Sequence, residues 1–227
     1  MKIIKTEKLT KVYDGKSFPV KALSNIDLEF EQGEFTAIKG PSGSGKTTFL
    51  NLIGGLDKPT SGKIIINGAE ISNLSDSKLI DFRLKNIGFV FQAYNLIPVL
   101  TAKENVSFIM LLQKTDKAKM EKRVRELLIQ VGLEDKMDAR PAKLSGGQQQ
   151  RVAVARALAS KPKFVLADEP TANLDTESAL NLLEIMAKLN KEENVTFIFS
   201  THDSRVIEKA RRVITLVDGA VAKDEKP

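Results

Sequence analysis

The segment GPSGSGKTT at residues 40–48 constrains the fold more than any other part of this 227-residue sequence. It matches the pattern G-x-x-x-x-G-K-[ST], in which glycines allow backbone N–H groups to wrap a phosphate. The apolar run GEFTAIKG leads into it, and a helical pattern follows from Lys46 to about Ile53. A phosphate-binding loop between a buried strand and a helix predicts an α/β domain.

Each residue of this loop has an expected task in binding a nucleotide. Lys46 should bridge the β- and γ-phosphates, Thr47 should give its hydroxyl to Mg²⁺, and Thr48 should reach the α-phosphate. The alternative is a glycine-serine turn before a helix, but the strand and helix on either side favour the nucleotide site. The residues expected to cradle the β-phosphate are Gly40, Pro41, Ser42, Gly43, Ser44 and Gly45.

A second candidate phosphate site begins at the segment LSGGQ, residues 144–148. Ser145 can cap a helix, Gly146 and Gly147 leave backbone N–H groups uncovered, and the helical run VAVARAL follows. The N-terminus of a helix carries a partial positive charge and binds phosphate. Because one nucleotide needs only one cradle, the second is most simply explained if it closes on a nucleotide held by another copy of the chain.

The two motifs together resemble the nucleotide-binding subunit of an ATP-binding-cassette (ABC) transporter, and the resemblance runs from Tyr13 to about Gly219. It implies an α/β fold of the ABC-type P-loop NTPase, with a mixed central sheet, an antiparallel β subdomain and a helical subdomain. It also implies ATP hydrolysis, with ATP and Mg²⁺ bound. The residues that it places on the partner copy's nucleotide are Ser145, Gly146, Gly147 and Gln148.

The resemblance also implies one nucleotide-binding domain over residues 1–227. Its core and β subdomain should cover about 1–90 and 160–227, and its helical subdomain about 93–158. Apolar alternation predicts early strands, and Asn67-Gly68 between apolar runs predicts a hairpin. Helical patterning predicts helices between about 96 and 133, and strands should alternate with helices thereafter. The last residues, KDEKP, are expected to fray.

Two acids, Asp168 and Glu169, follow the apolar run FVLA. An aspartate at the end of such a strand can orient Mg²⁺ through water. In the family that this chain resembles, the glutamate directly after that aspartate polarises the attacking water, so Glu169 is expected to be catalytic. The alternative is that the adjacent acids cap a helix, but the phosphate-binding loop favours the catalytic reading.

Three further residues take roles from the same resemblance. Gln92 resembles the Q-loop residue, whose amide oxygen contacts Mg²⁺ or the attacking water and links the γ-phosphate to the helical subdomain. His202, the single histidine, resembles the switch histidine that contacts the γ-phosphate and orients Glu169. It follows a predicted parallel strand, where α/β sheets bind ligands. Tyr13 resembles the aromatic residue that stacks on adenine.

The segment from Ala172 to Asp175 occupies the place of the D-loop, which is often Ser-Ala-Leu-Asp in members of the family. Asn173 stands where alanine is more common, which puts its contacts across a dimer in doubt. Asp175 should cap a helix that begins near Thr176, because aspartate is a favoured N-cap residue.

Composition restricts the partners. A net charge of +6 is compatible with nucleic acid, but the lysines are scattered, tryptophan is absent and only two tyrosines are present. We therefore expect no nucleic-acid partner. The basic charge instead favours an anionic ligand and a position beneath an anionic membrane leaflet. The absence of cysteine excludes disulfides, thiolate metal sites and cysteine nucleophiles.

No run of about eighteen apolar residues is present, and MKIIKTEKLT lacks the apolar block of a signal peptide. We therefore expect a protein made and kept in the cytosol, and the resemblance implies that it is peripheral on the cytoplasmic side of the cell membrane. Its expected partners are a second copy of itself, in an ATP sandwich, and an integral membrane permease subunit.

The segment FQAYNLIPVLTAKENV, residues 91–106, resembles subunits that serve macrolide exporters, lipoprotein-releasing systems, antimicrobial-peptide resistance transporters and the cell-division ABC complex. Its apolar part, between Gln92 and Glu104, is expected to receive a coupling helix of the permease. The main alternative is a soluble ABC ATPase that acts on nucleic acid or ribosomes. A nucleotide kinase would leave LSGGQ and His202 unexplained.

Overall fold

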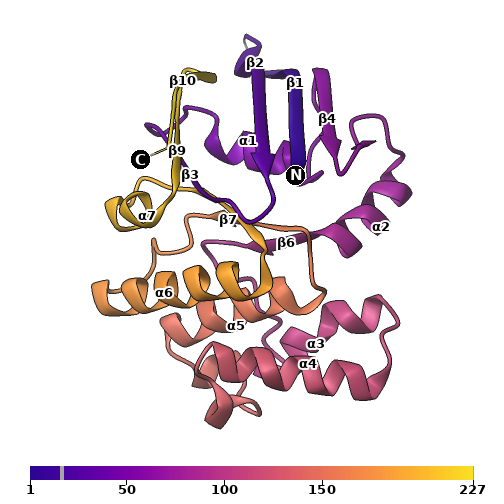
Figure 1. Ribbon diagram of the computed structural model, residues 1–227, viewed down its shortest axis with the longest axis vertical. Helices are drawn as coiled ribbons and strands as arrows, with labels where there is room; N and C mark the ends of the chain where they lie inside the picture. Colours follow the sequence, from indigo (N-terminus) through magenta and orange to yellow (C-terminus); the bar gives the residue numbers. More distant parts are fainter. Residues whose placement is uncertain (16–17, 227) are drawn as a thin grey trace.

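The computed structural model describes residues 1–15 and 18–226, which form two sheets and several helices (Figure 1). The strands are β1 (Lys2–Tyr13), β2 (Val20–Glu31), β3 (Phe35–Lys39), β4 (Ser61–Ile66), β5 (Ala69–Glu70), β6 (Ile87–Val90), β7 (Phe164–Asp168), β8 (Thr196–Ser200), β9 (Arg212–Val217) and β10 (Ala220–Glu225). The α-helices are α1 (Lys46–Ile53), α2 (Asp76–Asn86), α3 (Ala102–Leu112), α4 (Lys117–Gln130), α5 (Gly146–Ala159), α6 (Thr176–Glu193) and α7 (Ser204–Lys209). Short 3₁₀ turns are η1 (Glu134–Lys136) and η2 (Pro141–Lys143).

The larger sheet has the strand order β10-β9-β3-β8-β7-β6, and its strands from β9 to β6 run parallel. Its central strands are continuous apolar runs such as FTAIK and TFIFS, as expected for parallel strands covered on both faces. Parallel strands all end at the same edge. The segments that follow β3, β6, β7 and β8 therefore meet there.

The smaller sheet is antiparallel, with the order β2-β1-β4-β5. Asn67 and Gly68, both with positive φ, form the turn of its predicted hairpin between β4 and β5. Helix α1 lies in one apolar core with this sheet and with one face of the larger sheet, to which it gives Phe49, Leu52 and Ile53. The helix that carries the candidate phosphate loop is thus held by both sheets.

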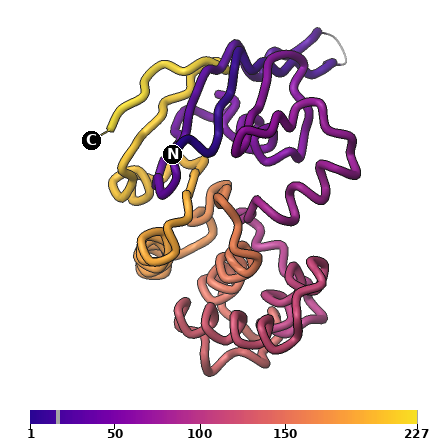
Figure 2. The backbone as a smooth tube through the Cα atoms, turned by 45° about the vertical axis from the view of Figure 1, so that its right-hand side comes forward, coloured from indigo at the N-terminus to yellow at the C-terminus, as the bar shows by residue number. Residues whose placement is uncertain are grey.

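The opposite face of the larger sheet packs against α5 and α6. Alternation along the strands explains this division, because Phe164 and Leu166 of β7 face the α1 core while Val165 and Ala167 face the α5 core. Helices α3, α4 and α5 pack together and form the end of the molecule far from both termini (Figure 2). In the described part of the chain, no helix is both long and apolar enough to span a bilayer.

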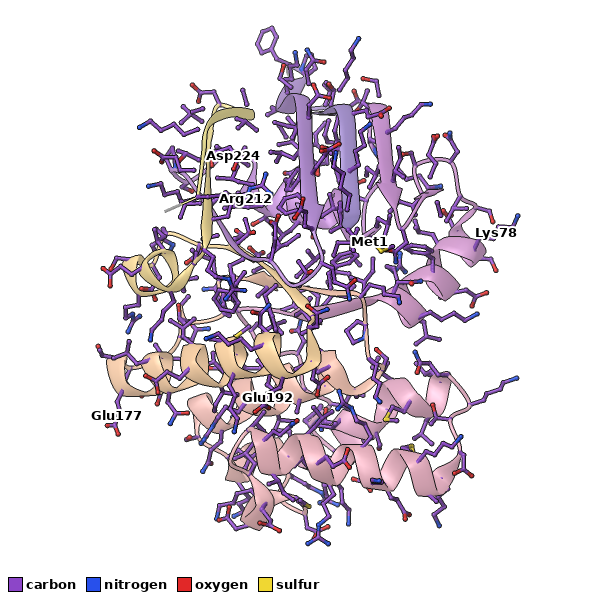
Figure 3. All side chains as sticks on the ribbon, viewed as in Figure 1. Met1, Lys78, Glu177, Glu192, Arg212 and Asp224 are labelled. Carbon is purple, nitrogen blue, oxygen red and sulfur yellow. The ribbon has the colours of Figure 1, made fainter. Side chains whose placement is uncertain are left out.

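The expectation for the C-terminal tail is wrong. Residues 220–225 form β10, which pairs antiparallel with β9, and only Pro227 of KDEKP lies outside the described residues. Arg212 on β9, 8 % exposed, donates to Asp224 at 2.7 and 2.6 Å and to Glu34 at 3.0 and 3.2 Å (Figure 3). The pKa of the Arg212 guanidinium is raised, chiefly by the hydrogen bonds to Asp224.

Helix α2 was also not expected from the sequence. Its segment DSKLIDFRLKN buries only Leu79, so it carries little apolar periodicity. Tertiary contacts hold it, since Leu79 enters the α1 core and Arg83 donates to the carbonyl oxygen of Gly55 at 2.5 Å.

The contact between Arg212 and Asp224 generates a prediction about stability. Arg212→Met leaves the half-buried Glu34 carboxylate and that of Asp224 without their cation, so the free energy of unfolding should fall by about 3 kcal/mol. Urea titration measures the change. Lys223 lies on β10 in an exposed ion pair with Glu225, so Lys223→Met should change the free energy of unfolding by less than about 0.5 kcal/mol. Equal effects of the two substitutions would show that Arg212 and its ion pairs do not stabilise the fold.

Candidate nucleotide-binding site

A cavity of about 650 Å³ lies where β3, β6, β7 and β8 end. The phosphate-loop residues from Gly40 to Thr48 line it, together with Gln92, Glu169 and His202. The fold therefore brings together four segments that are far apart in the sequence. A larger hollow, of about 950 Å³, lies on the antiparallel sheet, but charged side chains of both signs line it and none of the expected site residues does.

The phosphate loop turns sharply before α1. Gly45 is the N-cap residue of α1 with a φ of 97°, and a Cβ there would lie 2.5 Å from the carbonyl oxygen of Ala22. Only glycine fits this position, because both the backbone conformation and the space exclude a side chain. The Lys46 ammonium donates to the carbonyl oxygens of Gly40 at 2.8 Å and Pro41 at 3.0 Å, which holds it above the loop.

Thr47 and Asp168 meet at the edge of this cavity. The Thr47 hydroxyl lies 3.2 Å from both carboxylate oxygens of Asp168. Within residues 1–15 and 18–226, no group of three or more His, Cys, Asp or Glu side chains could hold a metal. A hard cation here would therefore complete its shell with phosphate and water oxygens, as Mg²⁺ does in nucleotide enzymes. The donor set fits Mg²⁺.

Glu169 and His202 are in direct contact. His202 Nδ1 lies 2.7 Å from Glu169 Oε1, and the Thr201 hydroxyl lies 3.4 Å from Oε2. An ionised carboxylate can only accept, so the Nδ1–H of His202 is the donor in this contact. Glu169 also has a left-handed φ of 47°, a conformation that is rare without glycine and that gathers at functional sites.

The backbone around Gln92 is held by side chains from two other motifs. The Gln92 carbonyl oxygen accepts from the Asn173 amide at 3.0 Å, and so links this segment to Ala172–Asp175. The buried Gln150 of α5 donates to the carbonyl oxygens of Phe91 at 3.4 Å and Pro170 at 2.8 Å. Only a folded structure connects these residues, and sequence reasoning missed Gln150.

Arg156 is a second residue that sequence reasoning missed. Its guanidinium donates to the carbonyl oxygens of Tyr94 at 2.8 Å and Asn95 at 2.5 Å, and burial lowers its pKa. Within the described residues, no carboxylate lies in salt-bridge range of it. Tyr94 and Asn95 both have left-handed φ values, of 57° and 51°. Arg156 therefore ties a strained turn after Gln92 to the helix that begins with LSGGQ.

The LSGGQ segment starts α5 as expected. The Ser145 hydroxyl accepts from the Gln148 N–H at 3.3 Å, and the Gln148 side chain accepts from the Ser145 N–H at 2.9 Å, which makes a capping box. Ser145 and Gly147 line a separate cavity of about 170 Å³. The larger cavity has no lining residue from this segment, so one copy of the chain does not join the two candidate phosphate sites.

Tyr13 lies at the end of β1 and is 39 % exposed. Its hydroxyl donates to Asp57 at 2.8 Å, and Asp57 also accepts from the Lys11 ammonium at 2.7 Å. Lys11 and Asp57 were not anticipated. The two-residue spacing of Lys11 and Tyr13 on one strand was the only available signal, because it places both side chains on one face. The expected N-cap role of Asp175 is confirmed, as it accepts from the Ser178 N–H at 2.9 Å.

Known proteins resemble this chain over nearly its whole length. The family model for ABC transporters matches residues 23–172. The lipoprotein-releasing system ATP-binding protein LolD 1 of Rhodopseudomonas palustris is 48% identical over 222 residues, which cover 97% of this chain and 98% of that protein. The uncharacterized ABC transporter ATP-binding protein MJ0796 of Methanocaldococcus jannaschii is 44% identical over 99% of this chain and 97% of that protein.

Solved structures agree with the sequence relatives. The dimeric structure of a post-hydrolysis state of the ATP-binding cassette MJ0796, bound to ADP and Pi, matches with a TM-score of 0.90 and 43% identity, and covers 99% of this chain and 98% of that one. The structure of cbiO1 from Clostridium perfringens matches with a TM-score of 0.89, 32% identity and coverage of 100% and 89%. The chain therefore belongs to the ABC transporter family as an ATP-binding cassette that hydrolyses ATP.

Asp203, beside His202, generates a prediction about pH. Donors from Arg205, and then from the Thr171 hydroxyl at 2.6 Å, lower the pKa of Asp203 from 3.8 to about 2. A carboxyl group whose pKa is lower in the folded than in the unfolded state stabilises the fold at pH values above its unfolded pKa. This contribution is lost as the pH falls from about 4 towards 2. Its size is on the order of 2 kcal/mol, since one pKa unit is worth about 1.4 kcal/mol.

Asp203→Asn should therefore be less stable than the parent at neutral pH, and the difference should shrink on acidification. Urea titrations from about pH 6 to about pH 3 measure this dependence. Asp218→Asn, at an exposed turn between β9 and β10, serves as the control and should follow the parent at every pH. A constant difference between the parent and Asp203→Asn down to the lowest pH would contradict the assignment.

Proposed function

We propose that two copies of this chain bind two ATP molecules head to tail and drive a membrane permease. The observation that carries this proposal is the separation of the two phosphate sites within one copy. The loop from Gly40 to Thr48 lines one cavity, and Ser145 lines another. A second copy can place its Ser145 on the γ-phosphate held by Lys46, which explains both sites with one ligand. The relative MJ0796 has a dimeric structure, which supports this arrangement.

The residues around the larger cavity supply the chemistry. The loop amides and Lys46 bind and orient the phosphates, and helix α1 adds its positive N-terminal end. Glu169 accepts a hydrogen bond from the attacking water and polarises it. His202, with Nδ1 on Glu169, holds that carboxylate and turns Nε2 towards the γ-phosphate side. When bound, Mg²⁺ neutralises phosphate charge, and Thr47, Gln92 and Asp168 would hold it.

Gln92 connects hydrolysis to motion in this proposal. Its side chain lines the nucleotide cavity, while its carbonyl oxygen accepts from Asn173. The next residues are tied to α5 by Arg156. A shift of Gln92 towards the γ-phosphate would therefore be passed to the helices. We propose that residues 93–158 move as a helical subdomain against the rest of the chain.

An apolar groove beside this segment is the proposed seat of the permease. It has a volume of about 310 Å³, and its apolar walls include Phe91, Ile97 and Phe108. The apolar side chains within residues 92–104 differ in exposure. Leu96 packs against the helical core, whereas Val99 is 70 % exposed. Val99 is therefore the better probe of docking.

The permease would place the chain at the cytoplasmic face of the membrane, as a peripheral subunit. The relatives support this by their names. LolD 1 belongs to a lipoprotein-releasing system, and cbiO1 is part of the ABC transporter complex cbiONQ. The segment 91–106 resembles the same lipoprotein-releasing branch. These relatives favour a transporter over the alternative of a soluble ATPase that acts on nucleic acid or ribosomes.

The sandwich is tested by trapping it. Glu169→Gln should bind ATP, lose at least about 10²-fold in turnover, and elute as a dimer with Mg-ATP in size exclusion. Adding Ser145→Asp should return it to the monomer. Aspartate still caps α5 but puts a negative charge against the partner's γ-phosphate.

The matched control is Thr101→Asp, the same kind of change at the capping box of α3. It should leave the trapped dimer intact. If Glu169→Gln stays monomeric at millimolar Mg-ATP, or if Ser145→Asp does not disturb its dimer, the head-to-tail sandwich is wrong.

The docking proposal can be tested because the sequence has no cysteine. Val99→Cys, labelled with a photocrosslinker, should attach to an integral membrane protein in membranes of the source cells and keep its ATPase rate within about twofold. Ile129→Cys is the control, since Ile129 is an exposed apolar residue of α4, outside both the groove and the segment 91–106. A soluble crosslinked product, or equal crosslinking at both positions, would place the docking surface elsewhere.

A further inference from the structure

Two side chains, Lys11 and Asp57, contact Tyr13, the residue proposed to stack on the base of the nucleotide. The Lys11 ammonium lies over the Tyr13 ring, 4.7 Å from its centroid. Asp57 accepts from Lys11 through Oδ1 at 2.7 Å and from the Tyr13 hydroxyl through Oδ2 at 2.8 Å. The three side chains therefore form a closed set of contacts around the ring.

These contacts are well shielded for a surface cluster. The Lys11 side chain is 12 % exposed and that of Asp57 is 29 % exposed. Lys11 also donates to the Lys58 carbonyl oxygen at 2.7 Å. Burial alone would raise the pKa of Asp57, but donors from Lys11, Tyr13 and the Lys58 N–H outweigh it and lower the pKa. Asp57 is thus an ionised acceptor at neutral pH.

Asp57 also belongs to the segment that carries the phosphate loop. Its N–H and that of Leu56 donate to the carbonyl oxygen of Asn51 in α1, at 3.3 and 2.8 Å. Tyr13, in contrast, belongs to the antiparallel sheet. The contact from Asp57 to Tyr13 therefore spans the two parts of the chain that would hold the two ends of a nucleotide.

We propose that Lys11 and Asp57 are positioning residues for the adenine base, which act by holding the Tyr13 ring at a set place relative to the phosphate loop. This inference rests on the proposed stacking role of Tyr13. The Lys11 ammonium occupies one face of the ring, so the base stacks on the other. A ring that is already ordered loses less entropy when the base binds, and the affinity rises accordingly.

Binding of two ligands separates this role from a structural one. Titration calorimetry with Mg²⁺ would compare a non-hydrolysable ATP analogue with inorganic tripolyphosphate, which has no base. Lys11→Met and Asp57→Ala should each weaken the affinity for the ATP analogue by about threefold to tenfold. The affinity for tripolyphosphate should change by less than about twofold, because the phosphate loop is untouched. Tyr13→Phe, which keeps the ring but loses the hydroxyl, should bind the ATP analogue with an affinity between those of the parent and Asp57→Ala.

The decisive arm repeats Lys11→Met and Asp57→Ala in a Tyr13→Ala background. Residues that act only through Tyr13 should cause no further loss there, as in any double-mutant cycle. Lys5→Met is the matched control, since Lys5 lies on the same strand in an ion pair with Glu7. It should leave both affinities unchanged. Asp57→Asn, which keeps the side-chain shape and one acceptor oxygen, substitutes if Asp57→Ala fails to fold.

The outcomes distinguish the inference from the function on which it rests. If Tyr13→Ala binds the ATP analogue as the parent does, the stacking role of Tyr13 is wrong and the inference falls with it. If Tyr13→Ala weakens binding but Lys11→Met and Asp57→Ala do not, only the positioning role is wrong. Equal losses for the ATP analogue and tripolyphosphate, or losses that persist without Tyr13, would also overturn it.

Discussion

The site depends on one constraint, which is that parallel strands end at a common edge. The phosphate loop follows β3, Gln92 follows β6, Glu169 follows β7 and His202 follows β8. These segments are far apart in the sequence, and their convergence comes from the parallel registers of β3 with β8, of β8 with β7 and of β7 with β6. Apolar residues on both faces of these strands hold that register, because the sheet is buried between α1 on one side and α5 and α6 on the other.

Several strained positions gather around this edge. Glu169, Tyr94 and Asn95 have left-handed backbones without being glycine, which costs on the order of 1 kcal/mol each. Each is compensated by specific contacts. Glu169 accepts from His202, and Arg156 donates to the carbonyl oxygens of Tyr94 and Asn95. The strain thus sits at the proposed catalytic glutamate, Glu169, and at the turn that leads to the helices, where a change in contacts can change conformation.

The cassette resembles half of a composite site. Its phosphate loop and its LSGGQ helix are both well formed, with a capping box at Ser145, yet they line different cavities. The proposed contacts with the base and with the phosphates are divided in the same way, since Tyr13 belongs to one sheet and Lys46 follows a strand of the other. In the first case a second copy would join the parts, and in the second the contact of Asp57 with Tyr13 joins them within one chain.

The sequence alone determined much of this protein, because its strongest signals are local. A glycine pattern before Lys46, an apolar run ended by Asp168 and a capping sequence at Ser145 carry the resemblance to the ABC family, whose fold this chain has. Other features needed the tertiary structure. Helix α2 has too little apolar periodicity to be seen, the arginine that holds β10 is itself held by Glu34, 178 positions away, and Asp57 meets Tyr13 across 44 positions. Such contacts depend on how the two sheets pack around α1, and no spacing along the chain encodes that geometry.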